Sequence, residues 1–257
     1  MNTKKYFVFF VPREVVSKHL CFSSFSNHKV YNITTIFLSN MLHPIQRVVV
    51  PFFLRLFWIK EVRGLENMPK DGRFIVTPSH GSFIDDWIMP VFVISMIDKE
   101  LHMYVNKNYW KNPLFALYMN HHKCIPVEVH DAKDKKEVNQ RAFEKALEYL
   151  NNNEPICIYP EGHRSPDGEL QKGKFGAAKL ALHAKAPVLP VGLVNTFDVW
   201  PKAKKFPKIK RIVKVNIGKP IYFEKYYKTK DKKDTLKKAT RTMMEEIAKL
   251  MNKKYRY

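Results

Sequence analysis

Short apolar runs alternate with segments of helical periodicity along most of this chain. Runs rich in Val and Ile predict strands at residues 74–76, 103–105, 124–127, 156–159, 188–194 and 212–217. Between them, apolar residues recur at helical spacing and predict helices over residues 86–97, 109–119, 136–152 and 175–184. This alternation is typical of an α/β fold, so we expect a mixed central sheet flanked by helices.

The far end of the chain predicts one more helix. An apolar stripe with helical spacing consists of Leu236, Ala239, Met243, Ile247 and Leu250. We expect this amphipathic helix to pack on the sheet rather than on a membrane.

The N-terminal part is unusually apolar but interrupted. Residues 30–59 are rich in Ile, Val, Leu and Phe, yet Pro44, Arg47, Pro51 and Arg55 break the run. No uninterrupted stretch of about 18 apolar residues exists, so we expect a kinked helical hairpin or a shallow helix in the membrane interface. A true span and a soluble docking helix are the alternatives. We therefore divide the chain into a membrane-associating segment, residues 1–61, and an α/β domain with a basic C-terminal region, residues 62–257.

Positive charge is concentrated near the C-terminus. The net charge is +21, and residues 201–257 carry 20 Lys and Arg against 5 Asp and Glu. Nucleic acid and phospholipid surfaces both attract such a region, and a solvated basic face without specific function is a third interpretation. The apolar N-terminal segment favours a membrane lipid surface as the partner, so no nucleic acid is expected.

Cysteine usage bears on compartment and metal binding. Cys21, Cys124 and Cys157 lack paired spacing, which favours a reducing compartment, and we expect attachment at the cytoplasmic face of a membrane. His121 and His122 stand near Cys124, but adjacent side chains on a strand point to opposite faces. No metal is therefore expected.

A histidine and an aspartate five positions apart form the first candidate site. His80 and Asp85 lie where the predicted strand at 74–76 turns into the predicted helix at 86–97. A neutral imidazole takes a proton from a hydroxyl only when its tautomer and ring plane are fixed, and a nearby carboxylate fixes both. We interpret His80 as a base and Asp85 as its orienting group. A helix-capping Asp85 beside a merely buried His80 is the alternative.

The second candidate site follows the predicted strand at 156–159. Its turn contains an acid, a guanidinium and glycines, among them Glu161, Gly162 and Arg164. The planar fork of Arg164 grips a phosphate with two parallel hydrogen bonds, and Gly162 lets the backbone come close to a ligand. The turn therefore predicts a phosphate site. A surface turn with an Arg–Glu ion pair is the alternative.

Together the two stretches resemble the glycerolipid acyltransferase family, which includes lysophosphatidic acid acyltransferases and glycerol-phosphate acyltransferases. The family's first motif, Asn-His followed by four residues and Asp, appears at residues 79–85 with Ser79 in place of Asn and with the usual Ser82. Its third motif, Pro-Glu-Gly-Thr-Arg-Ser, appears at residues 160–165 with His163 in place of Thr.

The resemblance covers residues 62–221 and includes the family's fourth motif at residues 186–191. The second motif departs from the pattern. The family reads Gly-x-Ile-Pro-Val-Asp-Arg, whereas residues 123–129 keep Ile-Pro-Val and have Val129 where Arg is expected. In the family that Arg is thought to help hold the phosphate of the acceptor, so the acceptor's identity stays open. Lys107 matches a family lysine suited to this task, and a solvated surface lysine is the alternative.

The resemblance implies an O-acyltransferase of phospholipid synthesis. His80, oriented by Asp85, would deprotonate an acceptor hydroxyl that attacks a fatty acyl thioester of coenzyme A or acyl carrier protein. The implied acceptor is a lysophospholipid, lysophosphatidic acid first, and the implied binding residues are Ser82, Lys107, Glu161, Gly162, Arg164 and Lys174. No cofactor is expected besides acyl-CoA or acyl carrier protein as co-substrate. Two alternatives stay open: another polar lyso-lipid acceptor, and a non-catalytic basic protein that binds membranes or nucleic acid.

Overall fold

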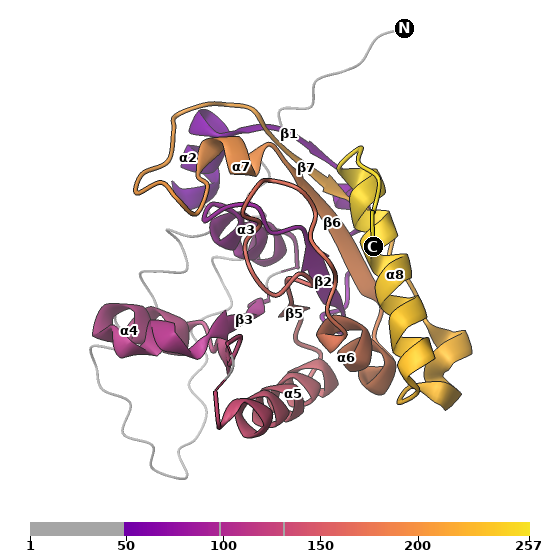
Figure 1. The fold of residues 1–257 in the computed structure, drawn as a ribbon. Helices are drawn as coiled ribbons and strands as arrows, with labels where there is room; N and C mark the ends of the chain where they lie inside the picture. The colour runs from indigo at the N-terminus through magenta and orange to yellow at the C-terminus, as the bar shows by residue number, and fades with distance from the viewer. Residues whose placement is uncertain (1–48, 98, 131) are drawn as a thin grey trace, which may run out of the picture. The chain divides into compact units, whose positions relative to one another are not determined.

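A computed structural model describes residues 49–97, 99–130 and 132–257. Their centre is a seven-stranded sheet in the order β1-β7-β6-β2-β5-β3-β4 (Figure 1). Neighbouring strands pair in parallel except β6 and β7, which are antiparallel. The strands are β1 (Ile59–Arg63), β2 (Ile75–Pro78), β3 (His102–Asn106), β4 (Ile125–Val127), β5 (Ile156–Cys157), β6 (Val188–Val194) and β7 (Val213–Ile217). The predicted α/β fold with a mixed central sheet is confirmed.

Helices cover both faces of this sheet (Figure 1). They are α2 (Val50–Phe57), α3 (Asp85–Ile97), α4 (Pro113–His121), α5 (Lys135–Asn151), α6 (Gly176–Ala184), α7 (Thr196–Val199) and α8 (Lys233–Leu250), with 3-10 turns η3 (Leu65–Asn67), η4 (Lys107–Lys111) and η5 (Glu224–Thr229). Side chains of α2 and α3 share one buried cluster, and those of α5, α6 and α8 share another. Ile75 of β2 belongs to the second cluster and its neighbour Val76 to the first. Successive strand residues point to opposite faces, so a strand covered on both sides is apolar throughout.

Helix α8 packs as the C-terminal stripe predicted. Ala239, Met243 and Ile247 are fully buried in the cluster that α8 shares with α5 and α6. The amphipathic helix therefore places its apolar stripe on the sheet side.

The predicted helix over residues 109–119 is two elements in the structure. It separates into η4 and α4 at Asn112, whose backbone is extended and whose side chain accepts hydrogen bonds from the N–H groups of Leu114 and Phe115. Pro113 disfavours the helical region for the residue before it, and Asn is a good N-cap. The prediction of a single helix was wrong because Asn112 and Pro113 form an N-cap and a first helical residue, which start a new helix.

The structure describes the predicted membrane-associating segment, residues 1–61, only from residue 49 onward. Helix α2 has Pro51 in its first turn and buries Leu54 against the sheet. The boundary that we drew between residues 61 and 62 falls within β1, which pairs with β7, so residues 59–61 belong with the sheet. Residues 1–48 of the predicted membrane-associating segment lie outside the described residues. In the described ranges, no helix has both the length and the apolar character needed to cross a bilayer.

Candidate active site

The loop between β2 and α3 holds the first candidate pair. Nδ1 of His80 lies 3.2 Å from Oδ2 of Asp85, and the same oxygen accepts a hydrogen bond from the backbone N–H of Ser82 at 2.7 Å. Asp85 is inaccessible to solvent; burial raises the pKa of its carboxyl, and the contact with His80 opposes that rise. When Nδ1–H is donated to Asp85, Nε2 keeps its lone pair and can accept a proton. This is the arrangement that the spacing predicted.

The parallel register of β2 and β5 brings the two candidate stretches together. Ile75 lies opposite Ile156 and Val76 opposite Cys157, so the residues after both strands emerge at the same edge of the sheet. Tyr159 stacks on the imidazole of His80 with the ring centroids 3.7 Å apart. The sequence analysis did not select Tyr159. Its position at the carboxyl end of a predicted strand was the signal available.

Glu161 joins the two stretches through backbone groups. Its Oε1 accepts the N–H of His80 and its Oε2 accepts the N–H of Gln171, both at 2.7 Å. The backbone N–H of Ser165 in turn donates to the carbonyl of His80 at 2.7 Å. Burial raises the pKa of Glu161 to about 7, and the two N–H donors oppose that rise. In this geometry Glu161 positions His80, since both of its carboxylate oxygens are engaged.

Arg164 contacts the loop that contains His80 and Asp85. Its guanidinium lies 4.0 Å from the ring centroid of Phe83, Nη2 donates to Asp86, and Nη1 donates to the hydroxyl of Tyr109 at 3.3 Å. Phe83 and Asp86 flank Asp85 closely in the chain, so Arg164 stands at the same sheet edge as the candidate base. Its charge is already paired with an acid. Asp86 and Tyr109 were not selected from the sequence, although a second acid directly after Asp85 was a visible signal.

Lys174 and Gly162 lie against each other. Gly162 has φ +73°, and a Cβ there would come within 2.8 Å of the Lys174 side chain, so a side chain at this position would displace the lysine. Lys174 is exposed, and no carboxylate is recorded as its partner among the residues that the structure describes. Of the three cations among the predicted binding residues, Lys107, Arg164 and Lys174, Lys174 is therefore the one whose charge is available to a ligand.

Ser82 and Lys107 have other partners in the structure. The fully buried hydroxyl of Ser82 donates to the carbonyl of Trp200 at 2.7 Å and accepts from the N–H of Ile84 at 3.2 Å. Lys107 pairs with Asp134 and with Glu128, and these two contacts raise the pKa of its ammonium. Both side chains thus make structural contacts here.

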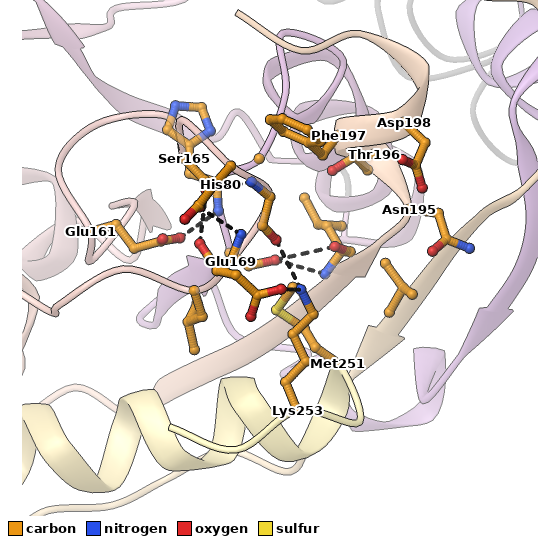
Figure 2. A pocket seen from close by; sticks show the side chains of 17 residues that line it. His80, Glu161, Ser165, Glu169, Asn195, Thr196, Phe197, Asp198, Met251 and Lys253 are labelled. Carbon is orange, nitrogen blue, oxygen red and sulfur yellow. Dashed lines mark hydrogen bonds and ion pairs between the residues drawn. The ribbon is translucent and has the colours of Figure 1, made fainter. Parts of the chain in front are cut away.

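A cavity of about 220 Å³, lined by both polar and apolar side chains, lies beside the loop of the candidate base (Figure 2). Of the eight predicted site residues, all within the described ranges, His80 and Glu161 line it. Lys253, from the segment after α8, reaches across to Glu169 and donates to the carbonyl of Gly168, each at 2.9 Å (Figure 2). The C-terminal segment thereby closes one side of the cavity, which is smaller than the roughly 300–1,000 Å³ of a drug-sized ligand site.

The argument made from sequence against a metal near His121 needs correction. That argument placed His121 and His122 on a strand, whereas His121 is the last residue of α4 and His122 is its C-cap. The structure brings both beside Glu100, with one ligand atom from each of the three residues within 4.8 Å of the others. The absence of a metal requirement stays a prediction.

Comparison with known proteins identifies relatives of this chain. A family model described as Acyltransferase matches residues 60–194. A 1-acyl-sn-glycerol-3-phosphate acyltransferase of Pseudomonas aeruginosa is 30% identical over 166 residues, which cover 64% of this chain and 60% of that protein. A chloroplastic 1-acyl-sn-glycerol-3-phosphate acyltransferase of Brassica napus is 25% identical over 170 residues, 66% of this chain and 47% of that protein. The chain thus spans about half the length of these relatives.

The fold has a solved counterpart. The 1-acyl-sn-glycerophosphate acyltransferase of Thermotoga maritima superposes with a TM-score of 0.60 over 88% of this chain and 84% of that one. At 21% identity the likeness shows a shared fold. The matched family segment contains both candidate stretches, from His80 to Arg164.

Proposed function

The chain belongs to the acyltransferase family, and we propose that it transfers a fatty acyl group from a thioester to the hydroxyl of a lysophospholipid, with lysophosphatidic acid as the first candidate acceptor. The observation that carries the proposal is the contact between His80 and the buried carboxylate of Asp85. Relatives named for acylation of 1-acyl-glycerol-3-phosphate support the choice of acceptor.

The geometry supports direct transfer with His80 as general base. Nε2 of His80 takes the proton of the acceptor hydroxyl while the oxygen attacks the thioester carbonyl. The new C–O ester bond forms, the C–S bond breaks, and the proton held by His80 passes to the departing sulfur, which leaves as a thiol. Asp85 stabilises the imidazolium that forms between the two proton transfers. The acyl donor is acyl-CoA or the acyl thioester of acyl carrier protein, and direct transfer needs no acyl-enzyme intermediate.

The phosphate of the acceptor would be held at the turn after β5. Lys174 offers an available ammonium above Gly162, and Arg164 offers a guanidinium fixed over Phe83. Because Arg164 already pairs with Asp86, an incoming phosphate shares or replaces that partner. Substrate binding therefore depends first on Lys174 and then on Arg164.

One observation favours a different polar lyso-lipid as the acceptor. The second motif has Val129 in place of the expected Arg, and Glu128 beside it is buried and lies 3.1 Å from Lys107. An acid thus neutralises the very lysine that the resemblance assigned to the phosphate. A headgroup with less negative charge fits this side of the site better than a phosphomonoester does.

Thiol release from acyl-CoA tests the proposal. The chain is mixed with acyl-CoA or with acylated acyl carrier protein and, in separate reactions, with lysophosphatidic acid, a zwitterionic lysophospholipid and a lyso-lipid without phosphate. We expect the fastest release with lysophosphatidic acid. Preference for an acceptor without phosphate would support the alternative acceptor, and no release with any acceptor or either donor would support the non-catalytic basic protein.

We also propose that the chain is attached to the cytoplasmic face of a membrane. Its support is the apolar character of residues 30–59 and the lipid nature of the acceptor. Fractionation of cells that produce the full chain tests it: we expect the chain with the membranes and sensitive to protease added from the cytoplasmic side.

A further inference from the structure

The segment between α7 and β7 combines high charge with exposed apolar side chains. Residues 201–211, here called the basic loop, contain six Lys and Arg and no acid: Lys202, Lys204, Lys205, Lys208, Lys210 and Arg211. Phe206 and Ile209, which stand among them, are 71% and 75% exposed. Exposed large apolar residues interleaved with cations are typical of surfaces that bind anionic membranes.

The basic loop is fixed to the fold by its backbone. The indole N–H of Trp58 donates to the carbonyl of Lys208 at 2.8 Å, and the indole N–H of Trp200 donates to the carbonyl of Lys204 at 3.1 Å. Since these bonds hold main-chain atoms on either side of Phe206, its exposure is set by the fold. The side chains of Lys204 and Lys208 stay available to a partner because these bonds use their carbonyls, while Nζ of Lys205 lies 5.4 Å from the ring centroid of Phe206.

The base of the loop is joined to the candidate active site. The carbonyl of Trp200 accepts hydrogen bonds from the hydroxyl of Ser82 at 2.7 Å and from the N–H of Phe83 at 3.3 Å. The rings of Phe83 and Trp200 also pack, with centroids 5.5 Å apart. Ser82 and Phe83 lie between His80 and Asp85 in the chain, so the position of the loop and that of the candidate base are linked by direct contacts.

Helix α2 extends the apolar part of this surface. In Figure 1 the basic loop, drawn in orange between α7 and β7, lies beside α2, and Trp58 at the end of α2 supplies one of the bonds just described. Three large side chains of α2 are about half exposed: Phe52, Phe53 and Leu56. The helix beside the basic loop therefore also carries exposed apolar side chains.

We propose that the basic loop docks on the surface of an anionic bilayer, with Phe206 and Ile209 entering the interface and the surrounding lysines lying on lipid phosphates. The docked loop would hold the His80 side of the molecule at the surface from which a lyso-lipid arrives. This last step rests on the proposed function, whereas the docking itself does not. A nucleic acid would use the lysines and stack a base on Phe206, but it would leave the aliphatic Ile209 without a matching partner. An acidic carrier protein is distinguished by the binding measurements below.

Vesicle partition of matched variants tests the docking. The loop variant replaces Lys204, Lys205 and Lys208 with Gln, and the control replaces three exposed lysines of α8, Lys233, Lys237 and Lys238, with Gln. Partition of the full chain is measured with phosphatidylcholine vesicles containing 30% phosphatidylglycerol and with pure phosphatidylcholine. A lysine at an anionic surface contributes roughly fivefold to binding, so the loop variant should lose about 100-fold on the anionic vesicles. The control should stay within about threefold of the native chain, because its charges lie away from the docked surface.

Depth-dependent fluorescence quenching tests whether the basic loop itself enters the bilayer. It does so even if other surfaces of the chain bind the vesicles and all variants therefore partition alike. Phe206→Trp places a fluorophore in the loop, and Tyr222→Trp places one at an exposed position outside it. With brominated lipids in anionic vesicles, the added fluorescence of Phe206→Trp should be quenched and that of Tyr222→Trp should not. Equal quenching of the two, or none at residue 206, would overturn the proposal. So would loss of acyl carrier protein binding by the loop variant with unchanged vesicle partition, which would identify an acidic protein as the partner.

The catalytic assay separates this proposal from the function proposed above. The Phe206→Ser, Ile209→Ser double variant should lose about tenfold in acyl transfer to an acceptor embedded in anionic vesicles and keep its rate on the same acceptor in detergent micelles. An equal loss in both media would reject a docking role for these side chains. A native chain inactive in both media, with residue 206 still quenched, would reject the enzymatic proposal and leave the docking intact.

Discussion

The two halves of the candidate site differ in what their charged groups already contact. Around the candidate base, the buried carboxylate of Asp85 is directed at His80 and at one backbone N–H. At the phosphate side, Arg164 and Lys107 both face acidic side chains, and Lys174 alone among the three predicted cations has none recorded in the described part of the chain. The proton-transfer pair is thus assembled before a substrate binds, whereas two of the three cations must share or exchange a partner.

The largest effect should come from the assembled half. Replacing His80 with Ala removes the proton acceptor, and a positioned base contributes roughly 10² to 10⁴ in rate, so acyl transfer should fall by at least 100-fold. Thiol release measures it, with the melting temperature as a control for folding. If His80→Ala kept a rate within tenfold of the native chain, the contact between His80 and Asp85 would have only a structural role, and the contrast between the two halves of the site would not hold.

The second effect concerns Glu161, which positions the base. The folded chain keeps a proton on this carboxyl up to a pH of about 7, while the unfolded chain loses it near the ordinary value of 4.5. The folded state therefore binds more protons in this window, and the free energy of unfolding should fall by about 3 kcal/mol as the pH rises from 4.5 to 7.

Urea unfolding at several pH values measures this dependence. Glu161→Gln, which has no proton to lose, should flatten the curve in the same window. Its stability should also fall at all pH values by about 1–3 kcal/mol, because its amide donor meets a backbone N–H where an acceptor is needed. A native curve that rises between pH 5 and 7 would show that the two backbone donors, not burial, dominate the pKa of Glu161.

The third prediction compares the cations on the phosphate side. Lys174→Ala should raise the KM for lysophosphatidic acid about tenfold with little change in kcat, since a lost charge–phosphate hydrogen bond weakens ground-state and transition-state binding alike. A fall in kcat with an unchanged KM would place Lys174 in the chemical step instead.

The smallest effect should come from Lys107. Its ammonium is held by Asp134 and Glu128, so Lys107→Ala should change the KM for the same acceptor by less than about threefold. An effect as large as that of Lys174→Ala would show that Lys107 leaves its acidic partners when the phosphate binds.

Much of the fold could be predicted because its central strands β2 and β6 are buried on both faces and are therefore largely apolar. The six predicted strands are present, and the runs at 188–194 and 124–127 lie within a residue of β6 and β4. Strand β1 was missed, since Ile59–Arg63 contains charged residues and follows an apolar helix. The break at Asn112 was missed for a local reason, as a polar cap and a proline interrupt an otherwise helical pattern.

Side-chain partners were harder to predict than residue types. The spacing of His80 and Asp85 already implied their contact, because a short loop restricts where both can point. The pairing of Arg164 with Asp86 joins residues 78 positions apart and depends on the register of β2 and β5. The contact between Lys253 and Glu169 likewise joins residues far apart in the chain, and it depends on where α8 packs on the sheet. Sequence patterns specify such elements but not how their ends meet.

A double-variant cycle tests the central claim, that Asp85 acts through His80, most directly. Acyl transfer to lysophosphatidic acid is measured for the native chain, Asp85→Asn, His80→Ala and the double variant, all matched for melting temperature. We predict that Asp85→Asn lowers the rate of the native chain by roughly 100-fold and leaves the residual rate of His80→Ala unchanged, because residues that act as a unit are not additive. Equal losses in both backgrounds would contradict the account, since Asp85 would then act independently of the imidazole.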